Sequence, residues 1–110
     1  MNVTIKPSEE FYRHFKRLSK KYRSLVDDYR VFREDLILNP FQGVDLGGGV
    51  RKVRMAIGAK GKGKSGGARV LTLTLLVSDD AEVTLLTIFD KSEIDNVSDK
   101  YIDWLVEKYK

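Results

Sequence analysis

The 110-residue sequence has no cysteine, a single histidine, only two prolines and no apolar run approaching the length of a membrane-spanning helix. The absence of cysteine excludes a disulfide framework, a thiolate metal site and a cysteine nucleophile. The histidine, His14, cannot build a histidine-rich metal site, and no partner at ligand or triad spacing accompanies it. We therefore expect His14 on a helix, beside its apolar stripe, and we expect neither a metal nor a cofactor.

The N-terminal segment lacks the apolar core of a secretion signal, because residues 1–11 read MNVTIKPSEEF. This indicates a cytoplasmic protein without a membrane partner. The length allows one core but not two that fold independently. Apolar residues make up 42% of the sequence and charged residues 33%, which is typical of a folded globular chain. We expect a single domain over residues 1–110.

Acidic residues are missing from one stretch. Arg51 to Arg69 holds seven basic residues and no acidic one. Residues 1–50 hold nine basic and seven acidic residues, and residues 70–110 hold four basic and nine acidic residues. The second half of this stretch, GAKGKGKSGGAR from Gly58 to Arg69, sets four of the cations among five glycines. A field of this kind attracts polyanions. The simpler alternative is a solvated charged loop.

The helical periodicity predicts an early helical hairpin and a final helix. Ser8 is placed to cap the first helix, and Ser24 to cap the second, with Asp27 completing a weak capping box. Asn39-Pro40 ends the second helix. Ser98 caps the last helix. Each helix carries an apolar stripe that must pack on a neighbouring layer.

The strand signals come in one early segment and three later ones. The predicted strands are Val3–Lys6, Val50–Ile57, Ala68–Val77 and Glu82–Phe89, and 41–49 is expected to be a loop. The result is an α+β fold: an N-terminal strand and a helical hairpin packed on one face of an antiparallel sheet, with a C-terminal helix. The other face is left basic, because Lys52 and Arg54 alternate with core residues. The glycine-lysine stretch becomes a mobile loop between two antiparallel strands.

One motif in this loop points to a nucleotide site. Residues 58–65, GAKGKGKS, match the phosphate-loop pattern G-x-x-x-x-G-K-[ST]. That mechanism requires a helix whose N-terminus faces the phosphates immediately after the loop. Here Ser65 is followed by GGARVLTLTLLV, which predicts a strand. The pattern therefore does not indicate a nucleotide-hydrolysing site.

A polynucleotide suits the stretch better. Lysines in a glycine-rich loop can follow a phosphodiester backbone, and the flanking Arg54 and Arg69 offer bidentate groups on more rigid strands. RNA cleavage further needs a base for the 2′-hydroxyl, charge to stabilise the phosphorane and an acid for the leaving 5′-oxygen. Crowded lysines and arginines can supply these functions without histidine.

The run VRKVRMAIGAKGKGKSGGARV, followed by LLTIFDKSEIDNVS and a terminal helix, resembles the RelE/ParE superfamily of toxins, in particular its HigB-like branch. The combination of RKxR, GKGKSGGxR and LLTxxxKxE at these spacings carries the resemblance, which covers nearly the whole chain. It implies a RelE-like fold and a metal-independent endoribonuclease that cuts mRNA in the ribosomal A site. It also implies a cognate antitoxin partner, often a helix-turn-helix protein.

The resemblance also implies a set of functional residues. Relatives often carry tyrosines where this chain has Thr72 and Leu73, and a tyrosine two residues before the late lysine, where this chain has Phe89. Those hydroxyls are possible proton donors, whereas Phe89 can still contact a base. The candidate catalytic residues are Arg54, Lys62, Lys64, Arg69 and Lys91, and the candidate RNA-binding residues are Arg51, Lys52, Lys60 and Phe89.

We therefore expect the toxin of a type II toxin-antitoxin system, acting on mRNA at the ribosome. The alternative from another class is a non-catalytic binder, either a gyrase inhibitor of the ParE type or a toxin that has lost its nuclease activity. The two differ in whether transcripts are cut when growth stops.

Overall fold

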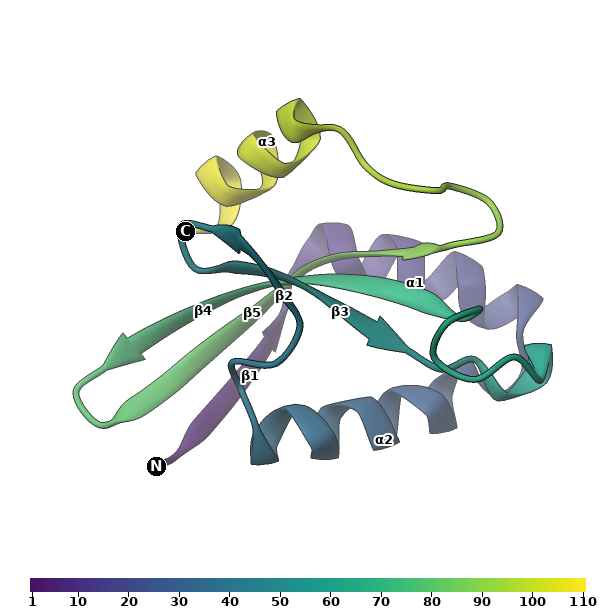
Figure 1. Cartoon of the computed structure of the whole chain (residues 1–110), viewed down its shortest axis with the longest axis horizontal. Helices are drawn as coiled ribbons and strands as arrows, with labels where there is room; N and C mark the ends of the chain where they lie inside the picture. The colour runs from purple at the N-terminus through teal and green to yellow at the C-terminus, as the bar shows by residue number, and fades with distance from the viewer.

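The computed structural model describes all 110 residues and is built on one five-stranded sheet in the order β1-β5-β4-β3-β2 (Figure 1). Strands β4 and β5 lie at the centre and bury nearly continuous apolar runs, as their sequences predict. The strands are β1 (Val3–Pro7), β2 (Val44–Gly47), β3 (Val50–Met55), β4 (Ala68–Val77) and β5 (Asp80–Asp90). The predicted α+β class is confirmed.

The helical hairpin, α1 (Glu9–Lys21) and α2 (Leu25–Leu38), packs on one face of the sheet. Ser8 caps α1 as predicted, because its hydroxyl accepts a hydrogen bond from the backbone N–H of Phe11 at 3.0 Å. Thirteen buried apolar residues form the main core: twelve come from both helices and strands β3, β4 and β5, and Ile57 follows β3. This layer holds α1 and α2 at fixed positions relative to the ends of the strands.

The third helix, α3 (Asp99–Tyr109), lies on the opposite face of the sheet, so that the strands run between it and α2 in Figure 1. Leu105 of α3 is fully buried in a second cluster with Val50, Leu71 and Leu86. Part of this face is therefore apolar and covered by α3, which corrects the expectation of an open basic face. Only the part of this sheet face that α3 does not cover is left for a functional site. None of the helices is long and apolar enough to cross a membrane.

A bulge in β5 decides which residues reach that site. Leu71 of β4 is paired with Thr87, but the next residue, Thr72, is paired with Leu85, so Leu86 is the extra residue. Leu85 and Ile88 both belong to the main core under the helical hairpin, whereas Leu86 packs under α3 on the other face. Because side chains alternate along a strand, an unbroken β5 would instead turn Ile88 away from that core. The bulge thus sets Phe89 on the α3 side.

Three local predictions needed correction. The expected loop at 41–49 contains β2, a short edge strand that pairs antiparallel to β3. The first strand runs parallel, not antiparallel, to its neighbour β5. The hydroxyl of Ser24 does not complete a capping box with Asp27; it donates to Asp28 at 2.7 Å. The two strand pairings depend on contacts between elements, whereas Ser24 bonds a different residue of its own helix.

Candidate functional site

Three candidate residues lie side by side across the sheet. Arg54 on β3 is paired in register with Arg69 on β4, and Arg69 is paired with Phe89 on β5. Residues opposite one another on neighbouring strands project to the same face, with Cβ atoms roughly 5 Å apart. The sheet therefore brings together two guanidinium groups and one aromatic ring from a span of the sequence in which the first and last residues are 35 positions apart.

Arg69 is the buried member of this row, with 5% of its surface exposed. Its guanidinium donates to the carbonyl oxygens of Lys64 and Ala68 at 3.0 and 3.1 Å, and to that of Ser65 at 3.0 Å. These bonds use three of the five N–H groups that an arginine offers. Burial, and then the charge of Arg54, lower the pKa of Arg69. Arg69 thus holds the end of the glycine-lysine loop, and Arg54 is the exposed cation of the row.

The start of the loop is a 3₁₀ turn, η1 (Gly58–Lys60), fixed to the N-terminus of α2. The backbone N–H of Gly58 donates to Asp28 at 3.0 Å, and that of Ala59 donates to the hydroxyl of Ser24 at 2.8 Å. The loop is therefore anchored at both ends. The partners of its first three residues lie at the start of helix α2, and the loop sequence alone does not reveal them.

Lys60 was expected to bind RNA, but its ammonium group is paired inside the protein. Its side chain is 10% exposed and its Nζ lies 2.8 Å from Oδ1 of Asp90, whose side chain is fully buried. Burial raises the pKa of Asp90, but hydrogen bonds from Lys60, Tyr22 and Ser92 outweigh this and lower it below its usual range. The structure therefore revises the prediction for Lys60: it ties the loop to the end of β5.

The remaining loop cations and the late lysine are exposed. Lys62 and Lys64 project from the middle of the loop, where Gly61 and Gly63 adopt positive φ values of 66° and 62°. A side chain at either glycine would strain this conformation. Lys64 Nζ lies 4.0 Å from Asp35, at the limit of an ion pair. The exposed Lys91 follows β5, and its backbone N–H donates to Gly67 at 3.2 Å, which sets it beside the loop.

The other two cations of β3 do not join the row. The guanidinium of Arg51 lies over the ring of Phe41, 5.3 Å from its centroid. Lys52 points toward α3, where it lines a cavity with Asp99 and Asp103. Of the three basic residues in the RKxR motif, only Arg54 lies beside Arg69. The predicted RNA-binding residues are therefore spread over several surfaces.

Comparison with known proteins places this geometry in a family. The family model described as "RelE toxin of RelE / RelB toxin-antitoxin system" matches residues 11–109. The chain belongs to the RelE toxin family. Among solved structures, the toxin is similar to a free-state double arginine-to-alanine mutant of the E. coli toxin RelE, with a TM-score of 0.58, 10% sequence identity and full coverage of both chains. At that identity the likeness shows the fold, which is the RelE fold.

The toxin's loop is not a phosphate loop of the nucleotide-hydrolysing type. It connects the antiparallel strands β3 and β4, and Ser65 is followed by a strand and not by a helix. The backbone amides at a helix N-terminus, which would cradle a nucleotide phosphate, are therefore absent after Ser65. This confirms the interpretation of GAKGKGKS as a coincidental match.

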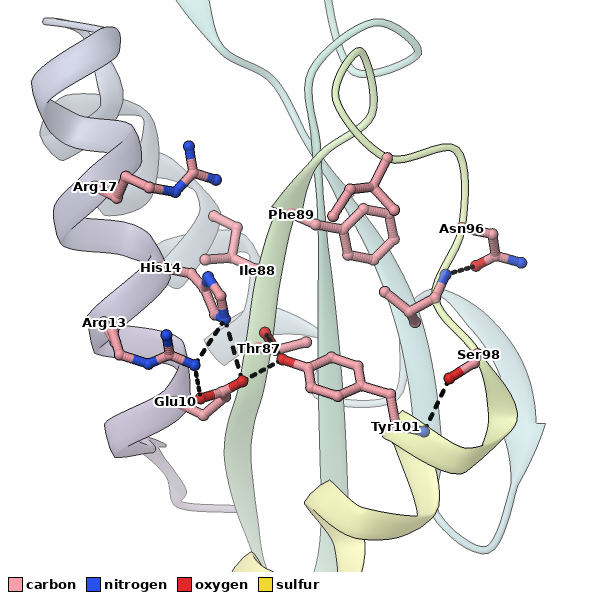
Figure 2. Close-up of a pocket in the computed structure, with 12 residues that line it drawn as sticks. Glu10, Arg13, His14, Arg17, Thr87, Ile88, Phe89, Asn96, Ser98 and Tyr101 are labelled. Carbon is pink, nitrogen blue, oxygen red and sulfur yellow. Dashed lines mark hydrogen bonds and ion pairs between the residues drawn. The ribbon is translucent and has the colours of Figure 1, made fainter.

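Sequence reasoning missed a polar network that joins α1 to α3. The carboxylate of Glu10, 7% exposed, contacts Arg13 Nη2 at 2.6 Å and His14 Nε2 at 3.1 Å, and it accepts a hydrogen bond from Tyr101 (Figure 2). Burial raises the pKa of Glu10, but these three partners outweigh it and lower the pKa to about 2. His14 thus has a partner one helical turn earlier, a spacing that the sequence does contain.

Burial and the hydrogen bond to Glu10 raise the pKa of Tyr101 to about 12, so this hydroxyl stays protonated. It lies 2.9 Å from the hydroxyl of Thr87 on β5. The network therefore fixes α1, β5 and α3 relative to one another, next to the row that ends at Phe89. The distant partner, Tyr101, could not be found from spacing, because it lies 91 residues from Glu10.

Proposed function

We propose that this RelE-family toxin, as one domain over residues 1–110, is a ribosome-dependent, metal-independent mRNA endonuclease that blocks translation. The observation that carries the proposal is the row of Arg54, Arg69 and Phe89, bordered by the exposed Lys62, Lys64 and Lys91. The exposed guanidinium of Arg54 suits a phosphodiester, and the buried Arg69 and Phe89, 5% and 4% exposed, support it from the neighbouring strands. Membership of a toxin family supports the same assignment.

The reaction we propose is attack of an RNA 2′-oxygen on the adjacent phosphorus. A new P–O2′ bond forms, the P–O5′ bond breaks, and a cyclic phosphate and a 5′-hydroxyl result. One lysine among Lys62, Lys64 and Lys91 takes the 2′ proton and another protonates the leaving 5′-oxygen. Arg54 bonds the phosphorane oxygens, and Arg69 adds charge while holding the loop.

We further propose that a cognate antitoxin, of the helix-turn-helix class, restrains the toxin in the cytoplasm. The family consists of toxins of toxin-antitoxin systems, which supports an antitoxin partner. The class of the antitoxin rests on the resemblance to HigB-like toxins. A neighbouring reading frame that encodes a small helix-turn-helix protein would support it, and co-purification of the two chains would test it.

One observation favours a second candidate, a toxin that binds its target without cutting RNA. Phe89 occupies a position where relatives often have a tyrosine, so no hydroxyl is available from this residue for proton transfer or phosphate contact. Binding to gyrase, or to the ribosome without cleavage, would then account for growth arrest.

Induced expression in bacteria, followed by mapping of mRNA 5′ ends, separates the two candidates. We expect new ends inside coding sequences within minutes, at fixed positions relative to the reading frame. An Arg54→Ala variant should lose these ends while remaining folded, because Arg54 is exposed. Growth arrest with intact transcripts would contradict the nuclease function and favour the binder.

A further inference from the structure

A groove runs between the edge strand β2 and helix α3. Two adjoining cavities of about 430 and 590 Å³ form it, and Leu46, Ile102 and Asp103 line both of them. Figure 1 shows β2 beside the C-terminal part of α3. Each volume is within the range of ligand-binding pockets. All four residues of β2 are exposed, so the chain itself leaves the groove unfilled.

Apolar side chains line much of this groove. Ile102 and Val106 come from α3, and the 42%-exposed Leu46 comes from β2. Gly47 and Gly48 form the turn at one end, and no atom lies within 4 Å of the position that a Cβ would take at either glycine. A partner can therefore approach both the apolar side chains and the backbone of the turn.

The α3 wall of the groove is acidic. Asp99, Asp103 and Glu107 line it at intervals of four residues along the helix. Asp99 and Asp103 are exposed and form no ion pair, and Glu107 is paired only with its neighbour in sequence, Lys110. The lining contains a single cation, Lys52. Three carboxylates against one ammonium favour a basic partner.

The spacing of these carboxylates suits an extended peptide chain. Residues four apart on a helix are separated by about 6 Å along its axis. In an extended segment, every second side chain points the same way, and these side chains lie roughly 6.6 Å apart. A segment in which basic and apolar residues alternate would therefore set its basic side chains against α3 and its apolar side chains against Leu46. RNA does not fit, because its phosphates would meet the carboxylates.

We propose that the groove binds a basic, extended segment of a ribosomal protein, so that the toxin contacts protein as well as RNA on the ribosome. The inference rests on the proposed function, which brings the toxin to the ribosome. Asn96 and Val97 line both this groove and the cavity beside Phe89, so the groove adjoins the end of the Arg54–Arg69–Phe89 row.

The charge of the groove distinguishes a ribosomal protein from the antitoxin. Proteins that bind nucleic acid often carry basic, flexible arms, which can become ordered on a partner surface. An antitoxin that covers the exposed cations of Arg51–Arg69 would need acidic side chains, whereas the groove favours basic ones. The ribosome supplies basic protein arms next to its RNA, which is the combination that the two surfaces of the toxin fit.

Binding to purified ribosomes tests the proposal without requiring cleavage. The ribosomes carry an mRNA with 2′-O-methyl groups in the A-site codon, which block attack by the 2′-oxygen. Affinity is measured for the unaltered toxin, for Asp103→Lys and for Asp79→Lys as the matched control. Both aspartates are exposed, but Asp79 lies in the turn between β4 and β5. A lysine at position 103 lies one helical turn from Asp99 and Glu107, so α3 should remain folded.

We expect Asp103→Lys to weaken ribosome binding about tenfold, because the new ammonium would face the basic segment. Asp79→Lys should not weaken it, since added positive charge by itself favours binding to RNA. Leu46→Ala should weaken binding a few fold, whereas Leu76→Ala, at another exposed leucine, should not. Equal affinities for Asp103→Lys and Asp79→Lys would overturn the proposal.

Crosslinking identifies the molecule that occupies the groove. Because the chain lacks cysteine, Leu46→Cys provides one thiol for a photoactivatable reagent. We expect a crosslink to a ribosomal protein, and we expect it to be lost when Asp103→Lys is added. Crosslinks only to ribosomal RNA, or only to a second toxin chain, would overturn the proposal. A loss of antitoxin affinity in Asp103→Lys, with ribosome affinity unchanged, would assign the groove to the antitoxin and also overturn it.

The outcomes separate this inference from the nuclease function. Ribosome affinity that depends on Asp103, with natural transcripts intact in cells, would support the groove and contradict the nuclease. Cleavage of natural transcripts, with ribosome affinity independent of Asp103, would do the reverse. Failure of the unaltered toxin to bind programmed ribosomes would contradict both.

Discussion

The cations of Arg51–Arg69 fall into two groups that look alike in sequence and differ in structure. Lys60 and Arg69 are largely buried and bonded to a carboxylate or to carbonyl oxygens. Arg54 and Lys62 are exposed. The buried pair shapes the loop, and the exposed group is available to a polyanion. A basic stretch is therefore not a uniform binding surface, because its buried cations hold the loop in place and only its exposed cations are available to bind a polyanion.

The largest effect on stability should come from Lys60→Ala. Removing this ammonium leaves the buried carboxylate of Asp90 without its closest cation, which costs roughly 3 kcal/mol of unfolding free energy. Lys62→Ala, two residues away and exposed, is the matched control and should change it by less than about 0.5 kcal/mol. Chemical denaturation measures both. Equal changes in unfolding free energy for the two variants would contradict the division into buried and exposed cations.

The largest effect on activity at unchanged stability should come from Arg54→Ala. Loss of a charged donor to a developing phosphorane typically slows catalysis by about 10²-fold or more. Arg33→Ala, another exposed arginine, on α2, is the control and should leave the rate unchanged. Single-turnover cleavage and a melting curve are measured for each variant. A melting temperature that falls with Arg54→Ala would place this residue in the structural group.

Acid should weaken the hydrogen-bond network around Glu10. Glu10 has a folded-state pKa of about 2, against 4.5 in the unfolded chain. Its contribution is therefore complete above about pH 4.5 and is lost as pH falls toward 2, with an upper limit of roughly 3 kcal/mol. Glu10→Gln should flatten this part of the stability profile, whereas Glu9→Gln, in the same helical turn but exposed, should not. Identical profiles for the two variants would show that the network does not stabilise the fold.

The smallest effects should come from the tip of the loop. Lys62→Ala and Lys64→Ala should each weaken binding to single-stranded RNA a few fold and reduce the salt slope of log affinity by about 0.7. Fluorescence titrations between low and physiological salt provide the slopes. Lys6→Ala, far from the loop and paired with Glu82, should not change the slope. An unchanged slope in both loop variants would exclude these lysines from the phosphate contacts.

The sequence predicted the three helices, the positions of four strands along the chain and the exposed setting of Arg54, because these follow from local periodicity and caps. It did not predict that α3 would cover part of the second face, since the partners of Leu105 come from distant strands. The pairing of Lys60 with Asp90 was also out of reach, because the two residues are 30 positions apart. The position of Phe89 depends on a bulge at Leu86, which leaves no clear mark in an apolar run.

The most direct test of the proposed function is single-turnover cleavage of a defined mRNA on purified ribosomes, with and without ribosomes and with the Arg54→Ala variant. We expect the unaltered toxin to cut within the A-site codon only when ribosomes are present, and the folded Arg54→Ala variant to cut about 10²-fold more slowly. An intact mRNA with the unaltered toxin bound to the ribosome, or equal rates for both proteins, would contradict it.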